Sequence, residues 1–367
     1  MKKYLLFVVV LLLITCNKSP TGTDDENRLR NADLSALQWT VDTLFTENSL
    51  NTVMYTIWGA SKNDVWVGGF NDNIYGIMWH YDGKKWTAWQ NPGIPGLSIG
   101  EIWGFADDDI WAVGERRRYA NQGYPGASDR MSLIMHYDGY EWKEILIPEN
   151  DVRAGLSSIG GAGPNDMYAG GANGTLYHYD GSKWKLDSLY LPVVPNDSNG
   201  TFISSISQGS AGDDIYLLQN WRMNYAVIPY PYLYKRENEK WVLKDSSDYW
   251  YYFNNLWLSP EKNLYLTGSE VVSWTEGTGF SSISTQLPTY RSHGMAGWDD
   301  NMLVSGRDGP TENPQFFHFN GTDWVQIFAL PQTGVTLSQL FFIDATVYFI
   351  VRTDYYPLKT LIYKGSF

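Results

Sequence analysis

Disulfide bonds are excluded as a source of stability, because the 367-residue sequence has a single cysteine, Cys16. Basic residues are scarce as well: 27 Lys and Arg stand against 40 Asp and Glu, and the formal net charge is −13. Since nucleic-acid binding depends mainly on Lys and Arg contacts with phosphates, this balance argues against a nucleic-acid partner. No segment of useful length has the apolar period of an amphipathic helix. These absences favour a β fold that is held together by packing alone.

A repeated pattern fills most of the chain. Each clear copy has Ile-Trp-Gly or Ile-Gly-Gly, then a short apolar run ending in Gly, then His-Tyr-Asp-Gly and a Trp; these copies span residues 57–86, 102–142 and 159–184. Weaker copies follow near Asp214, Asn263 and Asn301. The central position of the apolar run recurs at residues 66, 111, 168, 216, 265, 303 and 348, at intervals of 38 to 57 residues. Such intervals are typical of the four-stranded blades of a β-propeller.

Each copy is predicted to form four short antiparallel strands, which in the first copy cover residues 53–58, 65–68, 77–81 and 86–89. Asn63-Asp64 is expected to turn between the first two strands, because Asn and Asp bond their own backbone and tolerate left-handed dihedrals. Asp82-Gly83 is a strong hairpin signal between the third and fourth strands.

The last copy lacks the fourth strand and its Trp. At the other end of the chain, Gln38-Trp39-Thr40-Val41 resembles Lys85-Trp86-Thr87-Ala88, and Trp39 precedes Trp86 by one repeat of 47 residues. We therefore expect Gln38–Leu44 to pair with residues 361–364 and close the ring, which removes open sheet edges. The predicted fold is all-β: a seven-bladed β-propeller of four-stranded antiparallel blades, with the last blade closed by the N-terminal strand.

The motifs resemble those of kelch-like β-propellers in secreted bacterial lipoproteins. The likeness rests on Gly-Gly after the second strand, as at Gly68-Gly69, followed by Tyr-Asp and a Trp, as at Tyr81 and Trp86. It covers about residues 35–367, although the fourth and fifth copies lack Gly-Gly. Because such propellers share a fold and differ in function, the resemblance implies an architecture without naming a ligand.

The N-terminus has the pattern of an export signal. Lys2-Lys3 precedes the apolar segment Leu5–Ile14, which is too short to span a bilayer. The following Leu13-Ile14-Thr15-Cys16 resembles a bacterial lipobox, which implies lipidation of Cys16 and stable anchoring by its acyl chains. The predicted organisation is a lipoprotein signal peptide at 1–15, a flexible tether at 16–34 and a propeller domain at 35–367. We expect a monomer in the cell envelope, lipid-anchored to the outer membrane on its periplasmic or surface side.

Catalytic motifs are not visible in the sequence. Four of the five histidines occupy the same slot of the repeat, which indicates a structural role: His80, His136, His178 and His318. Only His293 is off the pattern, and neither a nucleophile motif nor a metal-spaced pair of His or Cys is present. We therefore expect no metal and no cofactor. Pairs of loop carboxylates remain open as an enzymatic alternative, with the candidates Glu115, Asp129, Asp151, Asp308 and Asp354.

Loops that break the repeat carry aromatic and Arg side chains, which are typical of binding surfaces. They belong to the loops after the second and fourth strands, which emerge at one face of a propeller, by convention the top. A shorter loop of the last blade adds Tyr355-Tyr356. The predicted ligand-binding residues of this face are Arg117, Tyr119, Trp221, Arg222, Tyr249, Trp250, Tyr251, Arg291, His293 and Arg307.

Three functions are compatible with this pattern. The first is a non-enzymatic module that binds a polysaccharide, a peptide or a partner protein on the top face. The second is a glycan lyase or hydrolase that uses top-face carboxylates, which would require two of them to face one pocket. The third is an envelope scaffold that binds its neighbours through the sides of the blades.

Overall fold

The computed structural model describes residues 34–72, 78–89, 91–117, 130–147, 154–187, 201–209, 212, 214–221, 230–246, 253–283, 287, 289–298, 301–308, 313–330 and 334–367. At residues 221, 230, 289–293, 298, 307 and 308 it describes the backbone alone.

Five separate sheets each contain four antiparallel strands. Four of these sheets use consecutive strands. The first contains β10 (Leu156–Gly163), β11 (Asp166–Gly171), β12 (Leu176–Tyr179) and β13 (Trp184–Leu186), and the second contains β14 (Thr201–Ile206), β15 (Tyr216–Trp221), β16 (Tyr230–Glu237) and β17 (Lys240–Ser246). The third contains β18 (Phe253–Leu258), β19 (Leu264–Gly268), β20 (Val271–Thr275) and β21 (Gly279–Ser282), and the fourth contains β22 (Thr289–Trp298), β23 (Asn301–Asp308), β24 (Pro314–Phe319) and β25 (Trp324–Ala329). The fifth sheet has the order β1 (Gln38–Leu44), β28 (Thr360–Ser366), β27 (Thr346–Thr353) and β26 (Val335–Ile343), and the short 3-10 helix η1 (Leu34–Ala36) precedes β1.

The remaining strands form one eight-stranded sheet: β2 (Thr52–Ser61), β3 (Asp64–Asn71), β4 (Met78–Tyr81), β5 (Trp86–Trp89), β6 (Ser98–Ala106), β7 (Asp109–Arg117), β8 (Arg130–Tyr137) and β9 (Trp142–Glu144). Among the described residues, the one strand pairing that joins its two halves, β2–β5 and β6–β9, is that of Phe70 with Ser98. The count of seven separate blades is thus corrected to five four-stranded sheets and this larger one. The cause is that β3 runs on to Asn71 and reaches the start of β6.

The predicted closure of the ring is confirmed. Strand β1 pairs antiparallel with β28 from Gln38 opposite Ser366 to Leu44 opposite Thr360. The ring of Trp39 stacks between Phe328 and Phe349, with ring centroids 4.6 and 4.8 Å apart. The N-terminal strand therefore supplies both the missing edge of the last sheet and the missing Trp.

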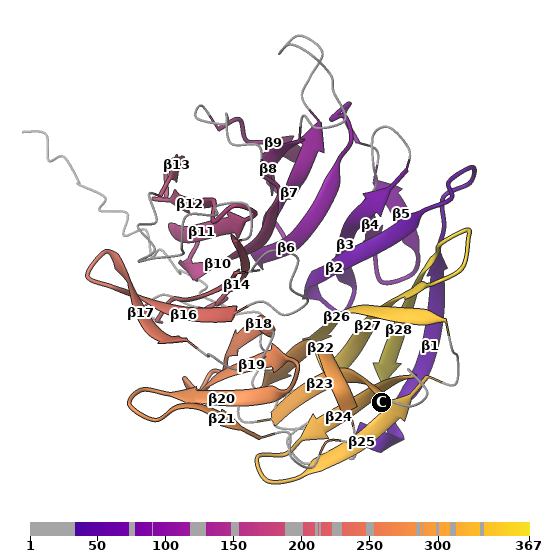
Figure 1. Ribbon diagram of the computed structural model, residues 1–367. Helices are drawn as coiled ribbons and strands as arrows, with labels where there is room; N and C mark the ends of the chain where they lie inside the picture. Colours follow the sequence, from indigo (N-terminus) through magenta and orange to yellow (C-terminus); the bar gives the residue numbers. More distant parts are fainter. Residues whose placement is uncertain are drawn as a thin grey trace, which may run out of the picture.

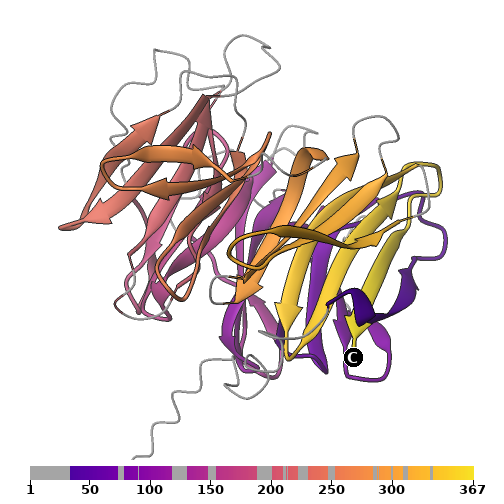
Figure 2. The ribbon, with the colours of Figure 1, turned by 90° about the horizontal axis from the view of Figure 1, so that it is seen from below.

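The sheets are arranged around a central axis like the blades of a propeller (Figure 1). Each innermost strand contacts the innermost strand of the next sheet, in the order β2, β6, β10, β14, β18, β22 and β26, and β26 contacts β2 again. Figure 2 shows at right angles that the strands run between the two faces of the ring, where the connecting loops gather. The prediction of an all-β propeller with four-stranded antiparallel blades is confirmed.

The repeated aromatic residues form the core between neighbouring sheets. Trp66 on β3 meets Trp142 on β9 edge to face at 5.4 Å, and Trp111 on β7 meets Trp184 on β13 at 5.7 Å. These rings are nearly buried. Since edge-to-face aromatic pairs are favourable, the second-strand aromatic of one sheet and the fourth-strand Trp of the next hold the ring together.

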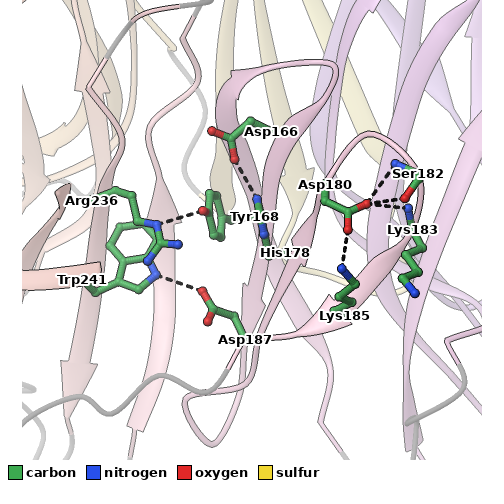
Figure 3. Close-up of polar contacts among 10 residues, drawn as sticks. All are labelled: Asp166, Tyr168, His178, Asp180, Ser182, Lys183, Lys185, Asp187, Arg236 and Trp241. Carbon is green, nitrogen blue, oxygen red and sulfur yellow. Dashed lines mark hydrogen bonds and ion pairs between the residues drawn. The ribbon is translucent and has the colours of Figure 1, made fainter. Parts of the chain in front are cut away.

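The repeated histidines bind within their own sheets. His178 on β12 contacts Asp166 of β11 through Nε2, at 2.8 Å, and stacks on Tyr168 at 4.4 Å (Figure 3). His80 and His136 make the same kind of contact with Asp64 and Asp109, at 2.6 and 2.8 Å. Each contact ties the third strand to the second, so these histidines serve the sheet.

A further set of hydrogen bonds links the innermost strands. Each of these strands has a β-bulge in its first half, and at five of them the side chain after the bulge reaches the next innermost strand. That side chain accepts a hydrogen bond from a backbone amide of the neighbouring strand at five junctions: Gln339 from Ile57 (2.6 Å), Thr56 from Ile102 (3.0 Å), Glu101 from Ile159 (2.7 Å), Ser158 from Ile206 (2.9 Å) and Ser205 from Leu256 (3.1 Å). The bulges therefore aim a side-chain oxygen across each of these junctions.

Candidate functional site

Most of the predicted site residues lie at the edge of what the structure describes or beyond it. Tyr119, Arg222, Tyr249, Trp250 and Tyr251 fall outside the described residues, as does the predicted lipidation residue Cys16. The backbone alone is described for Trp221, Arg291, His293 and Arg307. Arg117 is the one member of the set whose side chain is described.

Backbone pairing nevertheless relates several of these positions. Arg291 on β22 lies directly opposite Arg307 on β23, and His293 is one of two bulged residues of β22. Trp221 lies opposite Thr201 at the end of β15. These positions stand at the ends of second strands or the starts of first strands, the side of the ring that is called the top by convention; their role in binding stays a prediction.

The described top face carries five exposed apolar side chains that the sequence analysis did not select as a site. We call this set the top-face platform, and it consists of Leu50, Tyr55, Phe70, Tyr355 and Tyr356. Leu50, Tyr355 and Tyr356 are 60%, 62% and 71% exposed, and Tyr55 and Phe70 are about 40% and 37% exposed. Single exposed apolar residues are normal on a protein surface, whereas several on one face make that face a candidate for binding.

Backbone hydrogen bonds bring the parts of the platform together. The loop between β27 and β28, which carries Tyr355 and Tyr356, bonds to the loop before β2: the Leu358 amide donates to the Leu50 carbonyl at 2.8 Å, and the Thr52 amide donates to the Leu358 carbonyl at 2.9 Å. Phe70 on β3 pairs with Val53 on β2, two residues before Tyr55. The platform thus joins the last sheet of the ring to the β2–β5 half of the eight-stranded sheet.

Asp72 fixes the Leu50 loop against the end of β3. Its carboxylate accepts hydrogen bonds from the Ser49 hydroxyl, from the Leu50 amide at 3.0 Å and from the Asn51 side chain at 3.3 Å. Burial opposes ionisation of Asp72, but these hydrogen bonds outweigh it and lower the pKa of this carboxyl. The loop is therefore held by a charged acceptor at neutral pH.

A groove lined by both arginines and acids adjoins the platform. A hollow of about 400 Å³ lies between Phe70 and Asp72 on one side and Arg117 and Arg130 on the other. The exposed side chain of Arg117 passes over Gly96, where an added Cβ would lie 2.6 Å from its Cγ. Arg130 is 64% exposed and pairs with Glu115. An apolar surface beside arginines offers both contact area and directed hydrogen bonds.

Arg116 has a different role from Arg117. Its side chain is 1% exposed, pairs with Glu144 and donates to the Arg117 carbonyl at 2.9 Å. The Arg116 guanidinium also borders the groove, but its charge is paired with Glu144 inside the sheet.

Tyr55 stands between charges of the neighbouring sheets. Burial raises the pKa of the Tyr55 phenol, while Arg352 of β27 lowers it and Glu115 of β7 raises it. The phenol therefore stays neutral at physiological pH, and its side chain is about 40% exposed. Tyr55 is thus a residue of the platform that interacts with the charges of Arg352 and Glu115.

The carboxylates proposed for catalysis are engaged where they are described. Glu115 pairs with Arg130, and Asp354 accepts a hydrogen bond from the Thr336 hydroxyl at 2.7 Å. Asp129 and Asp151 lie outside the described residues, and only the backbone of Asp308 is described. Within the described part of the chain, no three His, Cys, Asp or Glu side chains are grouped as a metal site would need. Nor does any described helix have the length and apolar character needed to cross a membrane.

Glu101, on the innermost strand β6, is an acid whose pKa is strongly raised. Its carboxylate accepts hydrogen bonds from the Ile159 amide at 2.7 Å and from the Gln208 side chain at 3.1 Å. Burial raises the pKa of Glu101 to about 7, against the lowering effect of these hydrogen bonds. The carboxyl thus spans three sheets, and its contacts are those of a structural link.

Comparisons with known proteins show the fold. No family model matches the sequence, and no curated protein matches it. The structure is similar to YCF48 bound to D1 peptide, with 11% identity and a TM-score of 0.60, where the match covers 90% of this chain and 97% of that chain. It is also similar to YCF48 from Cyanidioschyzon merolae, with 15% identity and a TM-score of 0.58, where the match covers 89% of this chain and 98% of that chain. A third similar structure is the β-propeller domain of Cps50 (Swd1) from Myceliophteria thermophila, with 9% identity and a TM-score of 0.55, where the match covers 88% of this chain and 99% of that chain. At these identities the likeness shows that the chain has the β-propeller fold, and the kelch-like character of its repeats stays a prediction.

Proposed function

We propose that this protein is a non-enzymatic binding module that holds an extended peptide segment of a partner protein on its top-face platform. The observation that carries this proposal is the exposure of five large apolar side chains on one face of two neighbouring parts of the ring, whose connecting loops are fixed to each other by backbone hydrogen bonds and by Asp72. A pre-formed apolar surface loses little entropy on binding, and large aromatic side chains commonly dominate binding energy.

The charged surroundings favour a peptide as the ligand. The arginines beside Phe70 can bind backbone carbonyls or acidic side chains, while the ring faces of Tyr355 and Tyr356 contact apolar ones. A propeller of similar fold, YCF48, has been observed with a bound peptide, which supports the choice of ligand class. A polysaccharide is the alternative ligand, because exposed tyrosines also suit sugar rings.

We further infer that the eight-stranded sheet acts as two blades, which gives seven blades in all. Each half repeats the four-stranded order of the other sheets, and a single residue pair joins the halves. The seven innermost strands follow one another around the ring.

The cellular setting is proposed from the sequence alone: a kelch-like lipoprotein of the cell envelope, anchored through Cys16 to the outer membrane. The test is Cys16→Ser, which should move the protein from the membrane fraction to the soluble fraction and abolish incorporation of labelled fatty acid. A wild-type protein that takes up no fatty acid would refute the anchor.

The binding proposal is tested by probing the purified protein with a random peptide library and a glycan array. We expect peptides rich in apolar and acidic residues to bind, and the double variant Tyr355→Ala/Tyr356→Ala to lose about tenfold or more in affinity. Tyr140→Ala is the matched control, because Tyr140 is 91% exposed but lies in the turn between β8 and β9, away from the top face. Equal losses in both variants, or binding of glycans without peptides, would overturn the proposal.

A further inference from the structure

A second hollow, of about 610 Å³, lies on the flank of the ring between the last sheet and the β2–β5 half of the eight-stranded sheet. We call it the flank groove. One wall is formed by Trp79, Tyr81 and Trp86 of β4 and β5, and the opposite wall by Thr40, Asp42 and Lys364 of β1 and β28. These strands lie next to one another around the ring in Figure 1. The groove does not share a residue with the top-face platform.

Three lysines give the groove its charge. Lys84 and Lys85 stand exposed in the turn between β4 and β5, and the Lys364 ammonium lies 4.9 Å from the centre of the Tyr81 ring. Within the described part of the chain, none of these ammonium groups has a carboxylate in ion-pair distance. The groove therefore presents net positive charge on a protein whose formal charge is −13.

Two acids close to these lysines, Asp42 and Asp82, accept hydrogen bonds from other groups. Asp42 accepts a hydrogen bond from the Trp86 indole at 3.2 Å. Asp82 accepts hydrogen bonds from the backbone amides of Lys84 and Lys85, both at 2.9 Å, and these amides hold the pKa of Asp82 below its usual range. Both carboxylates keep their charge, and Lys85 also lowers the pKa of Asp82, but neither carboxylate lies within ion-pair distance of a lysine of the groove in the described part of the chain.

In other copies of the repeat, the aspartate that corresponds to Asp82 forms an ion pair with a lysine of the fourth strand. In the third copy, Asp180 pairs with Lys185 on the fourth strand at 2.5 Å, as Figure 3 shows, and in the second copy Asp138 pairs with Lys143 at 2.6 Å. The first copy has Thr87 at the corresponding place, so Asp82 has no such partner on its strand. The charge arrangement of the flank groove is thus a departure from the repeat.

We propose that the flank groove binds a short acidic peptide segment with interspersed apolar residues, contributed by a partner protein. The unpaired ammonium groups would receive its carboxylates, and the half-buried ring faces of Trp79 and Tyr81 would receive its apolar side chains. Strand β1 is the outermost strand of its sheet and offers an edge along which an extended chain can lie. A long polyanion is disfavoured, because beyond the groove it would meet the negative surface of the protein.

Binding of this kind is expected to be modest and dependent on salt. Exposed ion pairs contribute little individually and are screened by ions. We expect the affinity for an acidic peptide to fall by about tenfold or more when the ionic strength rises from about 0.05 M to 0.5 M.

The experiment is fluorescence anisotropy of the purified full-length protein with a short labelled peptide that alternates Glu and Leu. A peptide alternating Gln and Leu, and labelled heparin, serve as comparison probes. The variant Lys84→Gln/Lys85→Gln should weaken binding of the Glu peptide by roughly tenfold. Its matched control is Lys183→Gln/Lys240→Gln, which removes the same charge from exposed lysines elsewhere; Lys183 occupies the turn position in the third copy that Lys85 occupies in the first.

The outcomes separate the proposal from its rivals. The proposal holds if the Glu peptide binds, the Gln peptide does not, and only the Lys84/Lys85 variant is impaired. An equal loss of affinity for the Glu peptide in the control variant would show that binding depends only on the net charge of the protein. Stronger binding of heparin than of the peptide would indicate that the ligand is a polyanionic glycan. Either result overturns the proposal. Because the proposed platform also favours apolar and acidic peptides, both lysine variants are repeated in the Tyr355→Ala/Tyr356→Ala background. The loss on replacing Lys84 and Lys85 should persist there, since the flank groove shares no residue with the platform, so that failure at one site is distinguishable from failure at the other.

Discussion

Glu101 on β6 accepts a hydrogen bond from the backbone amide of Ile159 on β10, at 2.7 Å, and so links one sheet of the ring to the next. At equivalent junctions the acceptor is neutral: Thr56, Ser158, Ser205 or Gln339. Glu101 alone among these five can change its charge, and this makes the strength of one junction dependent on pH.

Replacing Glu101 with Gln should remove a pH dependence of stability. Because burial raises the pKa of Glu101 to about 7, the folded state holds a proton that the unfolded state releases near pH 4.5. Stability from this group is therefore present below pH 4.5 and lost as the pH rises through about 7. The free energy of unfolding of Glu101→Gln relative to wild type should increase by on the order of 1 kcal/mol between pH 5 and 8. Denaturant titrations at both pH values measure it, and a difference that does not change with pH would contradict this role.

Asp72 should stabilise the platform with the opposite pH dependence. Its hydrogen bonds lower its pKa in the folded state, so its contribution is present above the unfolded pKa and is lost as the pH falls through the folded one. Asp72→Ala should lower the melting temperature at pH 7 and weaken peptide binding at the platform, with the difference in melting temperature shrinking toward pH 3. Unaltered peptide binding by a folded Asp72→Ala protein would show that Asp72 does not position the platform.

Trp39 should be critical for closure of the ring. Its indole stacks on Phe328 and Phe349, and an added Cβ on Gly365 would lie 2.7 Å from the indole. Trp39→Ala should destabilise the protein by about 2–3 kcal/mol in denaturant unfolding, whereas Trp39→Phe should recover part of this loss. If both variants unfold like wild type, the N-terminal strand contributes little to the ring.

The repeated histidines should affect stability and leave ligand binding intact. His178→Asn removes the stacking on Tyr168 and shortens the reach to Asp166, which should cost about 1 kcal/mol of stability. Peptide affinity at the platform, measured on the folded variant, should equal that of wild type. Loss of binding without loss of stability would assign His178 to a ligand site.

The sequence was sufficient to predict the strands and the closure because both depend on local patterns. Trp39 and Trp86 stand at the same place in two copies of one motif, and β1 pairs with β28 as that place requires. The number of separate sheets was not predictable, since the merger of two sheets depends on the single pair of Phe70 and Ser98. No sequence pattern distinguishes such a pair from ordinary strand ends.

The candidate site was harder to predict because its residues do not come from the long loops. Tyr55 and Phe70 lie in regular strands, where the alternation of apolar residues predicts burial, and a bulge and a strand end expose them instead. Leu50 stands in a short loop whose position depends on Asp72, a contact across 22 residues. Tyr355 and Tyr356 were visible as loop aromatics, but only the fold brings them beside Leu50. The unpaired lysines of the flank groove did have a signal in the sequence, namely Thr87 at the place of Lys143 and Lys185.

The most direct test of the central claim is the affinity of the top-face platform for a peptide selected from the library. Isothermal titration of that peptide into wild type, Tyr355→Ala/Tyr356→Ala and Tyr140→Ala compares two sets of exposed tyrosines on one scaffold. The proposed function predicts that affinity falls by about tenfold or more in the platform variant and is unchanged in Tyr140→Ala. A platform variant that is folded and binds like wild type would contradict it.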